Sequence, residues 1–64
     1  MRYVLFEMNN VLFLAQKKTF EKMPFKDEVA IHDTPRTLEF AKDYAEAYER
    51  PLFFAVKAES VRMT

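Results

Sequence analysis

The sequence of 64 residues lacks cysteine, glycine and tryptophan altogether. Without cysteine the fold has no disulfide and no cysteine-ligated zinc site, and the single histidine, His32, excludes a histidine-rich metal site. Without glycine, turns must be made by residues such as asparagine, aspartate and proline, and a glycine-dependent phosphate-binding loop is impossible. We therefore predict a protein with no metal and no cofactor.

A net charge is missing too, and so is any long apolar run. Ten basic and ten acidic residues balance to zero, which argues against a dominant electrostatic attraction to nucleic acid or to an anionic membrane. No segment approaches the roughly 18 uninterrupted apolar residues of a transmembrane helix. Glu7, Asn9 and Asn10 interrupt the N-terminal apolar run, which distinguishes it from a signal peptide. We expect a cytoplasmic protein that does not contact a membrane.

The composition is nevertheless that of a folding chain. Half of the residues are apolar and seven are phenylalanine, and we expect one domain over residues 1–64. A domain of this size buries only roughly 60% of the surface that its unfolded chain exposes. Such a domain often needs additional stabilisation from disulfides, a metal ion or oligomerisation. Since disulfides and metals are excluded, we predict that the protein is stabilised by oligomerisation.

Two apolar runs at the start of the chain predict a β-hairpin. Residues 2–8 and 11–16 favour strands, and Asn9-Asn10 suits a type I′ turn, whose residues need positive φ. Alternate residues then point to opposite faces. One face is apolar throughout and comprises Val4, Phe6, Met8, Val11, Phe13 and Ala15. The other is polar only at its ends and comprises Tyr3, Leu5, Glu7, Leu12, Leu14 and Gln16.

Three further elements follow the hairpin. Residues 29–32 form a short strand candidate, and the second hairpin strand has room to continue to Pro24, where proline suits an edge. An amphipathic helix is predicted with Thr34 as N-cap, Pro35 as first helical residue and Pro51 as stop. Residues 52–63 predict a last strand, with Leu52, Phe54, Val56 and Ala58 on one face and Phe53, Ala55, Lys57 and Glu59 on the other.

The element order β-β-(β)-α-β predicts an α+β fold, in which one small mixed or antiparallel sheet carries a single helix packed on one face. The helix between strands permits a crossover, so the last strand can join the sheet as a parallel neighbour. We assign the helix to the more uniformly apolar face, which would comprise Val4, Phe6, Phe13, Phe54 and Val56.

This arrangement leaves the second sheet face uncovered. Each large apolar side chain left wet forfeits on the order of 1.5–3 kcal/mol, and the patch exceeds what soluble monomers usually expose. The cover is a second copy about a two-fold axis, a foreign protein, or residues 17–28 folded back as a lid through Phe20, Met23 and Phe25. We favour the homodimer. The predicted interface or partner-binding residues are Leu5, Leu12, Leu14, Phe53 and, at the helix margin, Phe40.

A lysine-rich segment after the hairpin suggests an alternative, a small nucleic-acid-binding module. Basic residues with interleaved aromatics bind single strands by phosphate contact and base stacking. The competing interpretation is a solubilising edge, where lysines discourage strand-to-strand aggregation. The residues concerned, within segment 17–26, are Lys17, Lys18, Phe20, Lys22, Phe25 and Lys26.

Catalytic residues are scarce. The adjacent pair His32-Asp33 suggests a general base with its carboxylate, but neighbouring strand residues point to opposite sides. The only serine is Ser60, and there is no cysteine nucleophile. We predict no enzyme, but a small protein-binding module of the inhibitor or regulator type, in the size class of those that viruses encode. The identity of a protein partner does not follow from the sequence.

Overall fold

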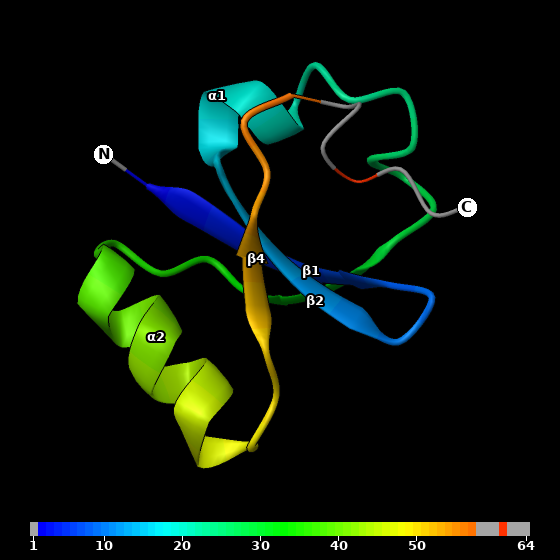
Figure 1. Ribbon diagram of the computed structural model, residues 1–64. Coiled ribbons are helices and arrows are strands. Elements are labelled where there is room, and N and C mark those ends of the chain that lie inside the picture. Colours follow the sequence, from blue (N-terminus) through cyan, green and yellow to red (C-terminus); the bar gives the residue numbers. More distant parts are fainter. Residues whose placement is uncertain (1, 58–60, 62–64) are drawn as a thin grey trace.

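Four strands form one mixed sheet in the computed structural model, which describes residues 2–57 and 61 (Figure 1). The elements are β1 (Tyr3–Met8), β2 (Val11–Gln16), α1 (Lys17–Phe20), β3 (Ala30–Asp33), α2 (Leu38–Ala47) and β4 (Leu52–Phe54). The strand order is β3-β1-β2-β4, with β1 antiparallel to both neighbours and β4 parallel to β2. The α+β class and the parallel last strand are confirmed. Ala58 and Glu59 of the predicted last strand lie outside the described residues.

The hairpin forms in the predicted register. Val11 pairs with Met8, and Phe13 pairs with Phe6. Asn9 and Asn10 take φ angles of 52° and 67°, as a type I′ turn requires. In a chain without glycine, asparagine is the residue that adopts this conformation at least cost.

The long helix covers the opposite sheet face from the one that we predicted. Ala41 and Ala45 of α2 pack on the leucine face of the hairpin, whose Leu5, Leu12 and Leu14 are 0%, 1% and 1% exposed. The prediction was wrong because it matched the helix to the most apolar face. The buried stripe of α2 is made of small alanines, and these allow the helix backbone to approach a layer of long leucine side chains.

The segment after β2 covers the phenylalanine face. Phe20 and Met23 are buried against it, and the rings of Phe20 and Phe25 lie 5.0 Å and 6.3 Å from the ring of Phe6, centroid to centroid. Figure 1 shows α1 and the loop after it well apart from α2. A lid of these three side chains therefore exists, but on the face that we had given to the helix. Strand β2 does not continue toward Pro24, because α1 turns the chain back to bring Phe20 over the sheet.

The two phenylalanines of β4 join the opposite hairpin faces from those predicted, although Phe54 does lie on the helix side of the sheet as expected. In the parallel register Phe53 is the partner of Phe13, and their ring centroids are 6.1 Å apart on the phenylalanine face. Phe54 lies on the α2 side, where its ring contacts that of Tyr3 edge-on at 6.4 Å. The register between strands 40 residues apart in sequence decides this placement, and periodicity within one strand does not fix it.

The start of α2 lies three residues later than predicted. The N-cap is Thr37, whose hydroxyl oxygen accepts a hydrogen bond from the Phe40 N–H at 3.1 Å. Thr34 does not cap the helix, and Pro35 is not its first residue. Pro35 is instead buried, and its carbonyl accepts a hydrogen bond from the Tyr3 N–H at 2.9 Å. The segment before α2 is thus fastened to the start of β1 before the helix begins.

Helix α2 ends in a Schellman motif built without glycine. The Arg50 N–H donates to the Ala45 carbonyl at 2.9 Å, and the Glu49 N–H donates to the Glu46 carbonyl at 3.0 Å. Glu49 has a φ of 54°, in the left-handed region where a side chain costs free energy. Pro51 follows directly and prevents the helix from continuing.

We expect Glu49→Gly to have a free energy of unfolding about 1 kcal/mol higher than that of Glu49→Ala, because glycine adopts the left-handed conformation without strain. Both variants remove the same charge, so alanine is the matched control. Urea denaturation of both measures the difference. Equal stabilities would show that position 49 does not hold this backbone conformation in solution.

Candidate functional site

A partly exposed network of polar side chains lies where β1, β3 and α2 meet. The Nε2 atom of His32 lies 2.7 Å from a carboxylate oxygen of Glu7, and its Nδ1 atom lies 2.9 Å from the Tyr44 hydroxyl. Arg50 donates to the same Glu7 oxygen at 3.1 Å and to the Asn10 carbonyl at 2.8 Å. The network thus joins β1, the hairpin turn, β3, α2 and the segment before β4.

The environment fixes two of the protonation states in this network. The hydrogen bond from Arg50, and next to it that with His32, holds the pKa of the Glu7 carboxyl below its usual value of 4.5. Desolvation raises the pKa of the Tyr44 phenol above its usual 10.0, and the nearby Tyr48 and Asp33 act in the same direction. At neutral pH Glu7 is therefore ionised and Tyr44 keeps its proton.

Such an arrangement can hold a proton but offers no activated nucleophile. Neutral His32 donates from Nε2 to Glu7 and accepts at Nδ1 from Tyr44; once protonated, it donates from both nitrogens. Asp33 does not join the network, since its carboxylate accepts from the Thr34 N–H at 2.7 Å. The network acts as a clamp between elements that are distant in sequence. Sequence reasoning missed it, although Glu7 is the only charge within residues 3–16 and could have indicated it.

The five residues predicted to bind a partner are not brought together. Leu5, Leu12 and Leu14 lie beneath α2 and could contact another protein only if the helix left the sheet. Phe40 is 52% exposed on α2 and Phe53 is 51% exposed, but Phe53 lies on the opposite side of the sheet. The predicted dimer through this sheet face loses its physical basis, because the face is already covered.

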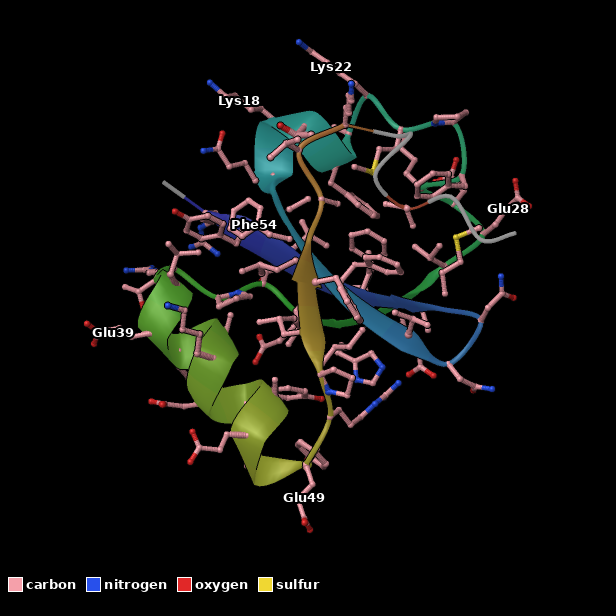
Figure 2. The ribbon with its side chains drawn as sticks, in the orientation of Figure 1. Lys18, Lys22, Glu28, Glu39, Glu49 and Phe54 are labelled. Atoms are coloured by element: carbon pink, nitrogen blue, oxygen red, sulfur yellow. The ribbon has the colours of Figure 1, made fainter. Side chains whose placement is uncertain are left out.

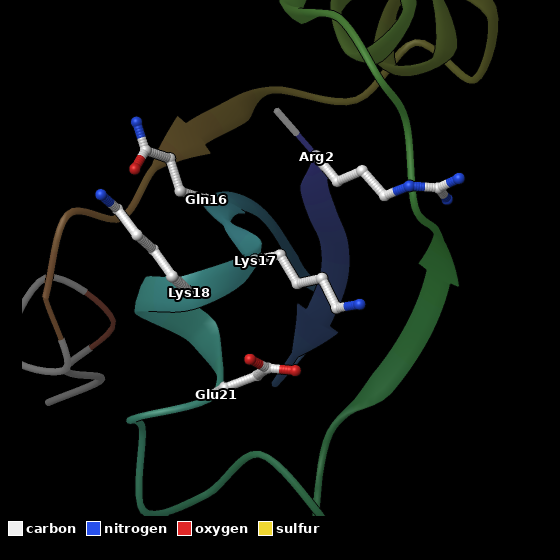
Figure 3. Close-up of a pocket in the computed structure, with 5 residues that line it drawn as sticks. All are labelled: Arg2, Gln16, Lys17, Lys18 and Glu21. Atoms are coloured by element: carbon white, nitrogen blue, oxygen red, sulfur yellow. The ribbon is translucent and has the colours of Figure 1, made fainter.

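In the lysine-rich segment the lysines are exposed at the surface, whereas the two aromatic rings are not. Phe20 is buried and Phe25 is half-buried against Phe6, so neither ring is free to stack on a base. The four lysines are exposed. Figure 3 shows Lys17 on the side of Arg2 and Glu21, and Lys18 on the side of Gln16. These five residues line a surface hollow of about 540 Å³ in which only charge remains for nucleic-acid binding.

Strand β4 forms an open edge of the sheet with large apolar side chains. Phe53 and Phe54 are 51% and 48% exposed, and Val56 beyond them is exposed as well. The Ala55 N–H donates to the Leu14 carbonyl at 2.8 Å, so the backbone groups of every second residue face β2. The backbone groups of Leu52 and Phe54 therefore face outward. Residues 52–56 contain no charge.

The opposite edge, β3, is protected in ways that β4 is not. Its pairing with β1 shifts register between Leu5 and Phe6, and such irregularities disfavour the addition of another strand. His32 on this strand is engaged with Glu7. Two acidic residues lie at the ends of β3, Glu28 just before the strand and Asp33 as its last residue. The two edges of one sheet thus differ, and β4 is the one open to a further strand.

These features define a small α+β protein with one polar network and one unprotected sheet edge. No protein-family model, curated protein or solved structure matches the chain. None of the helices in the described part of the chain is long and apolar enough to cross a membrane. Within the same residues, no group of three or more histidine, aspartate or glutamate side chains is placed to hold a metal ion.

We expect the ionised Glu7 to make stability depend on pH. Because folding lowers its pKa below 4.5, its contribution is present above that pH and is lost as the pH falls through the folded value. Urea denaturation between pH 6 and 3 should show a fall in the free energy of unfolding that is shallower in Glu7→Gln. Glu21→Gln, which removes a carboxylate with no ion pair to a described residue, is the control and should keep the wild-type slope. Identical slopes for wild type and Glu7→Gln would contradict the clamp.

Proposed function

We propose that the chain is a small protein-binding module that docks an extended segment of another protein chain along β4. The observation that supports this most directly is the unprotected edge, where Phe53 and Phe54 are half exposed beside outward-facing backbone groups. Strand addition of this kind uses main-chain hydrogen bonds for affinity and side-chain contacts for specificity.

The edge carries the groups that such binding needs. Leu52 and Phe54 each supply one outward N–H and one outward carbonyl. At the C-terminal end of β4, beside the end of β2 and α1, a hollow of about 210 Å³ is lined by Gln16, Thr19, Phe54, Ala55 and Val56 and can receive a side chain of the docked segment. Aromatic residues, phenylalanine among them, are enriched in the cores of protein interfaces, which fits two exposed phenylalanines in succession.

An exposed apolar edge strand favours aggregation unless a binding partner covers it. Proteins usually protect such strands with charges or irregularities. Residues 52–56 contain no charge, and the nearest charged residues are Arg50, before Pro51, and Lys57, directly after Val56. Binding a partner segment covers the apolar surface, and the module then acts by contact alone, as inhibitors and regulators of other proteins do.

Selection of nine-residue peptides from a random displayed library on the immobilised protein tests this function. We expect the selected peptides to contain alternating apolar residues and to lose about tenfold or more in affinity for Phe54→Lys, because a large apolar contact is replaced by a charge. Phe40→Lys changes an equally exposed ring on α2 and should bind normally. Peptides that tolerate Phe54→Lys but not Phe40→Lys or Lys17→Glu would place the binding surface elsewhere and overturn the proposal.

A further inference from the structure

We propose that the segment docked on β4 is β4 of a second copy, so that two copies join edge to edge about a two-fold axis at Phe53. This inference rests on the proposed function and names the partner. It moves the predicted homodimer from a sheet face, which α2 covers, to the open edge of the same sheet. The resulting sheet has eight strands, and the irregular β3 lies at both of its outer edges.

The backbone of β4 suits pairing with itself. Outward-facing groups belong to Leu52 and Phe54, which lie one residue to either side of Phe53. In an antiparallel pair centred on Phe53, Leu52 of one copy lies opposite Phe54 of the other, and each such pair exchanges two hydrogen bonds. Two pairs give four hydrogen bonds from a strand of three residues. Pro51 falls at an inward-facing position, so its missing N–H removes none of them.

The side chains match in the same register. The two Phe53 rings meet on the phenylalanine face, at the closely spaced position of an antiparallel ladder. On the α2 face, Leu52 of each copy lies beside Phe54 of the other. Aromatic and aliphatic cross-strand pairs are stabilising, and every large side chain of β4 obtains an apolar neighbour. The side chains of β4 are therefore complementary to those of a second β4, without a partner of different sequence.

Charge complementarity at the ends of the edge favours the antiparallel arrangement. Glu49 precedes Phe53 by four residues and Lys57 follows it by four, so the two-fold axis sets the Glu49 end of one copy against the Lys57 end of the other. Neither residue has an ion pair within the described part of the chain, whereas Arg50 is engaged with Glu7. Figure 2 shows Glu49 beyond one end of β4 and Phe54 near the other, with the Glu49 carboxylate pointing away from the sheet.

The test is the mass of the full chain in solution, measured by light scattering after size exclusion over a hundredfold range of concentration. We expect the mass to double as the concentration rises. Phe53→Lys places two like charges opposite each other and should weaken association by about a hundredfold, whereas Phe40→Lys should not change it. Glu49→Lys alone and Lys57→Glu alone should each weaken association, and the double charge reversal should restore it.

Amide hydrogen exchange of the wild-type protein is a second, independent measurement. It needs no variant, so misfolding of a variant cannot affect the result. The Phe53 N–H faces β2 and should be protected at every concentration, while the outward Phe54 N–H should gain protection only as copies associate. A monomer at all concentrations, or a dimer unaffected by Phe53→Lys with an unprotected Phe54 N–H, would overturn the second copy as partner. If library peptides still bind β4 of that monomer, the proposed function stands without this inference; if they do not, both fail.

Discussion

A hairpin that is apolar on both faces must be covered on both, and the rest of this chain is arranged to meet that requirement. Two alanines of α2 pack on Leu5, Leu12 and Leu14, while Phe20 and Met23 close the face that carries Phe6 and Phe13. A chain of 64 residues has little left once both layers are built. Within the described residues both sheet faces are covered, and the apolar side chains that stay exposed on β4 are Phe53 and Phe54 at the edge of the sheet.

The polar network follows from the same arrangement. The leucine face is polar at its ends, and Glu7 at one end lies where α2 approaches the sheet. An ionised carboxylate at such a boundary needs partners, and Arg50 and His32 supply them. Arg50 comes directly after the left-handed residue that ends α2, so the helix terminus, the hairpin turn and the approach to β4 are set together. The network ties the end of α2, from which the chain runs on to β4, to β1 and the hairpin turn.

Much of the fold could be predicted, because the hairpin, its Asn9-Asn10 turn and the amphipathic helix are encoded by neighbouring residues, and a helix between strands permits a parallel last strand. The sheet face that α2 covers could not be predicted in the same way. It depends on how alanines and phenylalanines from distant segments fill the two layers on either side of the sheet. The sequence favours Thr34 as cap because Pro35 follows it, but the hydrogen bond from the Tyr3 N–H to the Pro35 carbonyl holds that segment against β1, and the helix begins after Thr37. Of the residues predicted to form the binding surface, Phe53 and Phe40 are exposed but Leu12 is buried. The hydrogen bond between Glu7 and Arg50 joins residues 43 positions apart, so no pattern of neighbouring residues could predict it.

The most direct test of the two-layer arrangement is a nuclear Overhauser spectrum that records contacts of the Ala41 and Ala45 methyl groups. The structure predicts contacts from these methyls to the methyls of Leu12 and Leu14, and ring contacts to Phe6 from Phe20. Contacts from the alanine methyls to the ring of Phe6 would place α2 on the other face. The leucine face would then be open to a partner, and the proposed binding at the β4 edge would lose its support.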